Sequence, residues 1–367
     1  MKSCDSKIPA RLNRVGGQAV LEGVMMKAGE RVVTSCRKEN GEIVVSDSHF
    51  VSVRKKNKLL NIPILRGVIN FVEMMALSVK TLSKSAEALG FEDEETKFEK
   101  WLKARLGVNL LNIIMVIGTV LGLALAVTLF IVLPSAAADL LDYLLPAQLG
   151  LWRSVVEGAV RIAIFLLYLW LVSFMPEIKR TFMYHGAEHK SIACFESGAP
   201  LTPESAKEFT RFHPRCGTSY MFFMILIGVF AGMLIRVISP SLETWAYVAI
   251  KILILPLVMG IGYEVIMLAG KHDNIITRIL SAPGLWVQRL TTKEPSEDML
   301  VVAIISIKCA LRDEFPEFKE YYESRGWEKK ETEAAAEGEE APAEAVDGEV
   351  GEHSRPQENE EKAMGDE

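Results

Sequence analysis

The run NLLNIIMVIGTVLGLALAVTLFIVL, at residues 109–133, decides the fold class of this chain. It contains no charged residue, and most of its positions are Leu, Ile, Val, Ala or Gly. An α-helix rises about 1.5 Å per residue, so a helix of this length crosses a hydrocarbon core of about 30 Å. The run therefore predicts a transmembrane helix.

Three further apolar stretches follow this run, at residues 155–175, 220–238 and 247–269. Each approaches the length that a membrane-spanning helix requires. Half of all residues are hydrophobic and the mean hydropathy is positive, which is unusual for a soluble protein. We therefore expect a mainly α, polytopic membrane protein built on a four-helix transmembrane bundle.

Basic residues are distributed unevenly among the connections between these stretches. They are frequent before the first stretch and after the second and fourth, whereas the connections at 134–153 and 239–244 are poor in them. Cytoplasmic loops carry the excess of Lys and Arg, so we expect both termini on the cytoplasmic side of the plasma membrane. All five cysteines then face the cytoplasm, where thiols stay reduced.

Outside the apolar stretches, the chain divides into segments of different composition. An Asn-Gly pair at residues 40–41 favours a tight turn, and it separates two strand-like runs at 31–37 and 42–47. The expected organisation is an N-terminal β-hairpin unit at 14–60, an interfacial helix and connector at 61–105, the membrane bundle at 106–270 with a cytoplasmic His-rich insertion at 176–219, a C-terminal cytoplasmic helical segment at 271–327 and a disordered acidic tail at 328–367.

Charge is concentrated in the tail. Residues 328–367 hold 15 acidic and 4 basic residues, a net charge of −11, so the first 327 residues carry +5. A basic body suits the anionic surface of the cytoplasmic leaflet, and the basic run at 54–58 fits that surface better than a nucleic acid. The lipid bilayer is therefore the expected partner, and no nucleic acid is expected.

Residues 184–190, Tyr-His-Gly-Ala-Glu-His-Lys, carry the main chemical signal. His185 and His189 are four residues apart, so they share one face of a helix and can reach one cation. The order His-x-x-Glu-His is that of inverted zincins, in which the histidines bind zinc and the Glu is the general base. Glu188 is thus the candidate catalytic base. Alternatively, Glu188 is a solvated carboxylate or a group that orients a His ring. The alternative for His185 and His189 is that they form hydrogen bonds to the backbone or to lipid headgroups.

Three more residues are candidate metal ligands. His213 and Cys216 are separated by a spacing common among metal ligands, and together with the first two histidines they would make a closed tetrahedral site. Their alternative role is a turn before the third apolar stretch. Glu264 lies within the fourth stretch, where an ionisable group is a functional candidate. It is either a carboxylate ligand or the partner of a basic residue.

Four short segments of the sequence together resemble one known family, the YqhQ-like integral membrane proteins of bacteria. That family is a domain of unknown function and is labelled a predicted metal-dependent enzyme. The stretches that carry the resemblance are residues 16–26, 184–190, 212–219 and 262–265. It extends over about residues 14–318 and implies an integral membrane protein without supplying a reaction. The resemblance supports a metal site at His185, Glu188, His189, His213 and Cys216.

Two hypotheses of function follow. The first is a metal-dependent hydrolase at the cytoplasmic face of the membrane, with zinc as the expected cofactor and a peptide or lipid-linked group as substrate. The second is a non-enzymatic scaffold, assembly factor or carrier whose metal is structural. The number of protein ligands distinguishes the two, because catalytic zinc keeps one position open and structural zinc does not.

Overall fold

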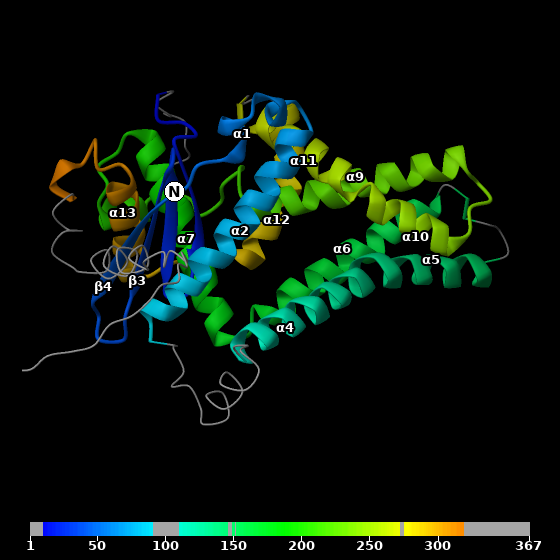
Figure 1. The fold of residues 1–367 in the computed structure, drawn as a ribbon, viewed down its shortest axis with the longest axis horizontal. Helices are drawn as coiled ribbons and strands as arrows, with labels where there is room; N and C mark the ends of the chain where they lie inside the picture. Colours follow the sequence, from blue (N-terminus) through cyan, green and yellow to red (C-terminus); the bar gives the residue numbers. More distant parts are fainter. Residues whose placement is uncertain (1–9, 91–109, 146–148, 151, 272–274, 319–367) are drawn as a thin grey trace, which may run out of the picture. The chain divides into compact units, whose positions relative to one another are not determined.

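The computed structural model describes residues 10–90, 110–145, 149–150, 152–271 and 275–318 (Figure 1). The acidic tail at 328–367 lies outside the described residues, as does most of the connector between the expected interfacial helix and the first apolar stretch.

A four-stranded antiparallel sheet forms the N-terminal part of the fold. Its strands lie in sequence order: β1 (Val15–Val20), β2 (Gly23–Ala28), β3 (Arg31–Arg37) and β4 (Ile43–His49). The predicted hairpin corresponds to β3 and β4, in which Arg37 is opposite Ile43. The hairpin prediction was too small, because β1 and β2 precede it in the same sheet.

Helices cover both faces of the sheet. On one face lie α7 (Pro176–Ser197) and α13 (Glu297–Ala310), and on the other lies α2 (Leu65–Ala88). Residues of β2 alternate accordingly: Val24 and Met26 join the core under α7 and α13, whereas Met25 faces Leu77 of α2. The sheet is therefore the middle of three layers, which explains why successive residues of its strands are buried.

The apolar part of the chain is helical. Its elements are α4 (Leu110–Val127), a π-helical turn η2 (Thr128–Val132), α5 (Leu133–Leu144), α6 (Trp152–Val172), α9 (Gly217–Ile238), α10 (Thr244–Leu253), α11 (Leu255–Lys271) and α12 (Ile275–Thr291). The remaining short helices are α1 (Val53–Lys56), η1 (Lys58–Asn61), α8 (Pro203–Lys207) and η3 (Pro316–Phe318).

Among the described residues, three helices are long and apolar enough to cross a membrane, and a fourth results if α10 and α11 count as one span. The first, Val120–Leu144, runs further than the expected end at residue 133, because η2 carries the helix through into α5. The last is bent by 49° between α10 and α11.

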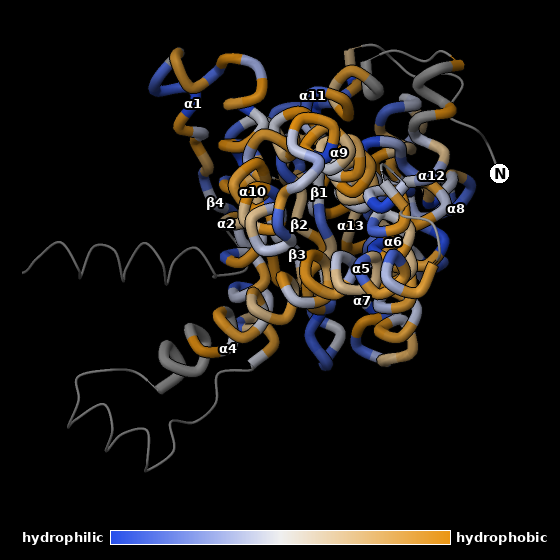
Figure 2. Tube along the Cα trace, turned by 90° about the vertical axis from the view of Figure 1, so that its right-hand side faces the viewer, coloured by the Kyte–Doolittle hydropathy of each residue, from blue (hydrophilic) through white to orange (hydrophobic). Residues whose placement is uncertain are grey.

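These helices expose large apolar side chains. Leu123 is 67% exposed, Leu167 is 54% exposed and Phe230 is 62% exposed. Figure 2 shows hydrophobic residues predominating along α4 and α10. Apolar surface of this extent requires an apolar environment, which a lipid bilayer supplies. Some of the described charges inside the group pair with one another, as Arg153 does with Asp139 and Lys251 with Glu157. Arg161 instead donates to the Phe130 carbonyl oxygen.

Helix α2 joins the sheet to the apolar helices. It packs on α11 where Gly67 meets Gly260, and a Cβ at Gly67 would lie 3.0 Å from the Gly260 backbone. Helix α12 packs along α9 and α6, whereas α13 packs on the sheet. The segment expected at 271–327 therefore divides between the two parts of the fold.

Candidate metal centre

Helix α7 carries the His motif through the interior of the protein. It starts at Pro176, which suits the first position of a helix, and it ends before Gly198, whose φ of 78° requires glycine. Every residue from Gly186 to Glu196 is buried. The motif therefore lies at a junction of packed elements rather than in an exposed cytoplasmic loop.

Three of the five predicted ligands come together. One potential ligand atom from each of His185, His189 and Cys216 lies within 4.8 Å of the other two. The Nε2 atom of His185 is 3.2 Å from the Cys216 Sγ, and the two imidazole centroids are 4.4 Å apart. Cys216 is the N-cap residue of α9, so an apolar helix and α7 each contribute to the cluster.

Backbone carbonyls fix the orientation of both rings. The Nδ1 atom of His185 is 2.8 Å from the Thr291 carbonyl oxygen, and the Nδ1 atom of His189 is 2.6 Å from that of Arg211. A carbonyl oxygen only accepts hydrogen bonds, so each Nδ1 carries the proton. In the neutral ring, Nε2 then has a free lone pair, and this is the arrangement that orients metal-binding histidines.

His213 and Glu264 lie outside this triad. The His213 ring centroid is 5.5 Å from that of His189, but its Nε2 atom is 3.3 Å from the Arg215 guanidinium. Glu264 accepts a 2.6 Å hydrogen bond from Arg66 of α2. The second interpretation of Glu264, a partner for a basic residue, is therefore the one that the geometry matches.

Glu188 lies beside the triad with a side chain that is almost entirely buried. Its Oε2 atom has no hydrogen-bond partner among the described residues. Burial raises the pKa of Glu188, the charges of His189 and His185 oppose that rise, and the Cys216 thiolate adds to it. A carboxyl in this environment holds its proton more strongly than a carboxyl in water does.

Gly17 makes room for the Glu188 side chain. A Cβ at Gly17 would lie 3.0 Å from the Glu188 Cγ and 2.7 Å from the Met25 carbonyl oxygen. Gly17 is therefore part of the site: the strand approaches α7 closely because it lacks a side chain there.

Electrostatics couple the triad when no cation is bound. Burial alone would raise the pKa of Cys216, but the charges of His185 and His189 outweigh it and hold that pKa well below its ordinary value. Burial opposes charge on His185 too, yet the Cys216 thiolate and Glu188 raise the pKa of His185 to about 9. Burial and Arg215 lower the pKa of His213 to about 4, although Glu196 opposes the change.

Gln288 positions the loop that carries Cys216. Its amide donates to the His213 carbonyl oxygen at 2.7 Å and accepts from the His213 backbone N–H at 2.8 Å. The residue is fully buried on α12. Gln288 was not among the residues predicted from the sequence, because a lone amide in an apolar helical pattern is a weak signal.

Gly186 brings residues 291–295 against α7. A Cβ there would overlap the Lys293 carbonyl oxygen, and the Lys293 N–H donates to the Phe182 carbonyl oxygen at 2.8 Å. This close approach places the Thr291 carbonyl beside His185. Buried Lys190, which pairs with Glu294, holds the same segment.

The comparisons with known proteins identify relatives but no activity. Residues 62–313 match the model of a family described as "Protein of unknown function (DUF1385)". The chain is 36% identical over 303 residues to "Uncharacterized protein YqhQ" of Bacillus subtilis (strain 168). The aligned region covers 81% of this chain and 92% of that protein. No solved structure matches.

Proposed function

The chain belongs to the family described as "Protein of unknown function (DUF1385)", and we propose that it is a zinc-dependent hydrolase of the plasma membrane. In this proposal the apolar helices form a four-helix transmembrane bundle with both termini in the cytoplasm. His185, His189 and Cys216 hold the metal at the cytoplasmic end of the bundle.

The observation that carries the proposal is the convergence of two oriented imidazoles on one thiol. Hydrogen bonds at Nδ1 leave the Nε2 lone pairs of His185 and His189 available, and Cys216 supplies a thiolate. Two imidazoles and one thiolate form a donor set suited to zinc. Three protein ligands leave a fourth position open, as in catalytic rather than structural zinc sites.

Each neighbouring residue then has a defined task. Zinc bound here would act as a Lewis acid. Glu188, buried beside both histidines, would accept the proton of an attacking water and pass it to the leaving group. The carbonyls of Thr291 and Arg211 would hold the two rings in place. A substrate reaching this site is a peptide or a lipid-linked group at the cytoplasmic surface of the membrane.

The competing function is a scaffold, assembly factor or carrier with a structural metal. Its support is His213, which belongs to the same loop as Cys216 and whose ring lies 5.5 Å from that of His189. This function requires His213 to leave Arg215 and become a fourth ligand.

The test is metal content and hydrolysis with the full-length protein purified in detergent. We expect about one zinc per chain in the wild type, and its loss in His185→Ala and Cys216→Ala. Cys194→Ala is the matched control, because Cys194 is a buried cysteine whose Sγ donates to the Pro200 carbonyl away from the triad. Glu188→Gln is expected to keep zinc and to lose hydrolysis of a panel of amide and ester substrates.

Three results would contradict the proposal. The wild type would fail to bind zinc after reconstitution, Cys216→Ala would keep the wild-type content, or Glu188→Gln would hydrolyse the substrates as fast as the wild type. Loss of one equivalent of zinc in His213→Ala, with no hydrolysis by the wild type, would support the structural role.

A further inference from the structure

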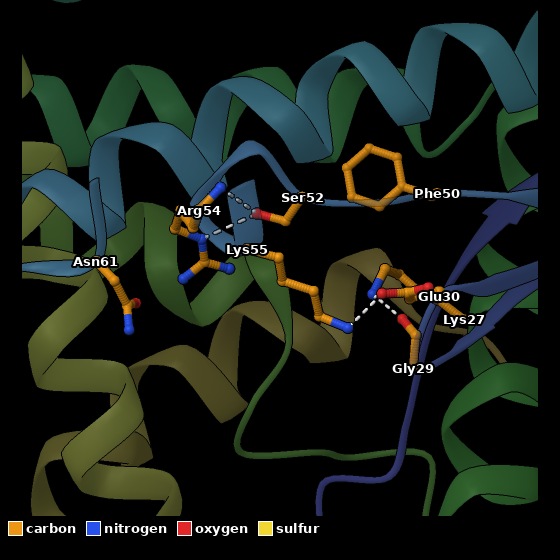
Figure 3. A pocket seen from close by; sticks show the side chains of 8 residues that line it. All are labelled: Lys27, Gly29, Glu30, Phe50, Ser52, Arg54, Lys55 and Asn61. Atoms are coloured by element: carbon orange, nitrogen blue, oxygen red, sulfur yellow. Dashed lines mark hydrogen bonds and ion pairs between the residues drawn. The ribbon is translucent and has the colours of Figure 1, made fainter. Parts of the chain in front are cut away.

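A second site lies at the end of the sheet where β2 turns into β3. It is a cavity of about 270 Å³ between the β2–β3 turn, the segment after β4, and helices α1 and η1. Figure 3 shows the side chains that line it, with the amino groups of Lys27 and Lys55 converging beside Glu30. None of these residues belongs to the metal centre.

The lining of this cavity carries more positive than negative charge. Lys27, Arg54 and Lys55 are basic, and Glu30 is the single acidic residue among those that line it. Lys55 pairs with Glu30, and Glu30 also lies 3.2 Å from His49. The one carboxylate that lines the cavity is therefore shared between two partners. A second carboxylate, that of Glu73, lies beside the cavity and accepts hydrogen bonds from the Ser52 hydroxyl and the Val53 N–H. Among the described residues, neither carboxylate forms an ion pair with Lys27 or Arg54.

Arg54 and Lys27 have neutral partners among the described residues. Arg54 donates to the Ser52 hydroxyl at 3.2 Å and to the Asn70 side-chain oxygen at 3.2 Å. Lys27 donates to the Gly29 carbonyl at 2.6 Å. Burial lowers the pKa of Lys27, and the charges of Lys55 and Arg54 lower it further, although Glu73 and Glu30 oppose the change. An anion in the cavity would relieve this repulsion.

Exposed apolar residues are neighbours in the sequence of the residues that line the cavity. Val53 is 46% exposed, Leu59 is 74% exposed and Ile62 is 54% exposed, and all three lie on or next to α1 and η1. This segment leads directly into α2, which packs on α11 of the apolar helices. Ile64, directly before α2, lies against Gly260 of α11. The cavity thus combines cations, an apolar rim and a position next to a membrane helix.

We propose that this cavity binds the headgroup of an anionic phospholipid. The phosphodiester would lie among Lys27, Arg54 and Lys55, and the acyl chains would follow Leu59 and Ile62 into the bilayer. Basic residues at a membrane surface attract anionic lipids, and an apolar rim distinguishes a lipid from a free phosphate. The lipid would hold the sheet against the membrane.

The experiment measures phosphatidylglycerol binding to the full-length protein in detergent by native mass spectrometry. Phosphatidylethanolamine is the zwitterionic comparison and inorganic phosphate is the competitor. Removal of each cation is expected to weaken binding about fivefold, so Lys27→Gln/Arg54→Gln should weaken it about 25-fold. Lys38→Gln/Lys56→Gln removes the same charge outside the cavity and should bind as the wild type does.

A further variant separates binding from damage to the fold. Glu30→Gln removes the competing carboxylate, so phosphatidylglycerol should bind more tightly, a result that a disrupted pocket would not produce. The proposal fails if Lys27→Gln/Arg54→Gln binds phosphatidylglycerol as the wild type does, or if both lipids bind equally. It also fails if inorganic phosphate at low millimolar concentration displaces the lipid completely, because the cavity would then be a site for a free anion.

Discussion

Replacement of Gly186 by Ala tests how the fold builds the metal centre. The added Cβ would overlap the Lys293 carbonyl oxygen, and it would lie 3.3 Å from the Lys293 carbonyl carbon and 3.4 Å from the Pro295 Cδ. The segment after α12 must therefore move away from α7. Because the Thr291 carbonyl precedes this contact by two residues, its hydrogen bond to the His185 Nδ1 should lengthen or break.

The magnitudes follow from these contacts. Overpacking of a buried contact costs about 1–3 kcal/mol, and Ala in place of Gly returns about 1 kcal/mol of helix propensity. We expect the free energy of unfolding to fall by about 1 kcal/mol. Loss of a partner that orients a metal-binding histidine typically weakens metal binding by about 10–100-fold. This loss corresponds to about 1.4–2.8 kcal/mol, so the free energy of zinc binding should fall by more than the free energy of unfolding.

The assay is zinc affinity by competition with a chelator, with thermal melting in detergent recorded in parallel. Gly217→Ala is the control, because Gly217 is also helical and directly follows Cys216, but a Cβ there meets nothing within 4 Å. The control should keep the wild-type affinity. An unchanged zinc affinity in Gly186→Ala would refute the argument that the tight packing of residues 291–295 orients His185.

Two other predictions concern the loop that presents Cys216. Gln288→Leu leaves the backbone N–H and carbonyl of His213 without partners, each at a cost of about 1–3 kcal/mol. Thermal melting should therefore show a clear loss of stability. Gln288→Glu should recover part of that stability. Glu196 pairs with Arg215. Burial of the Glu196 carboxyl opposes its ionisation, but the hydrogen bond from His213 and the charge of Arg215 outweigh the effect of burial and lower the pKa of Glu196. The pair therefore stabilises the fold above the ordinary carboxyl pKa, near pH 4.5, and this contribution is lost as the pH falls through the lowered value. Wild-type stability should decline more steeply below pH 4.5 than that of Glu196→Gln, and equal slopes would show that the pair contributes nothing.

The features that the sequence predicted correctly depend on local or periodic patterns. The apolar stretches became helices because each is long and almost uncharged, and the strands around residues 40–41 formed because Asn-Gly favours a tight turn. His185 and His189 share one helix face because four residues make about one turn.

The features that it missed depend on long-range packing. Gly17 of strand β1 lies against Glu188, 171 positions further on, and the glycines of this run do not identify that partner. Gln288 acts through a loop that precedes it by 75 positions. Arg66 and Glu264 meet only because α2 packs on α11. No local pattern reports such contacts.

The most direct test of the central claim is X-ray absorption spectroscopy of zinc in the full-length protein. We predict one sulfur and two imidazole nitrogens from the chain, with the sulfur signal absent in Cys216→Ala and retained in Cys194→Ala. A zinc environment without sulfur, or one with the same ligands in His185→Ala as in the wild type, would contradict the assignment of His185, His189 and Cys216 as the metal ligands.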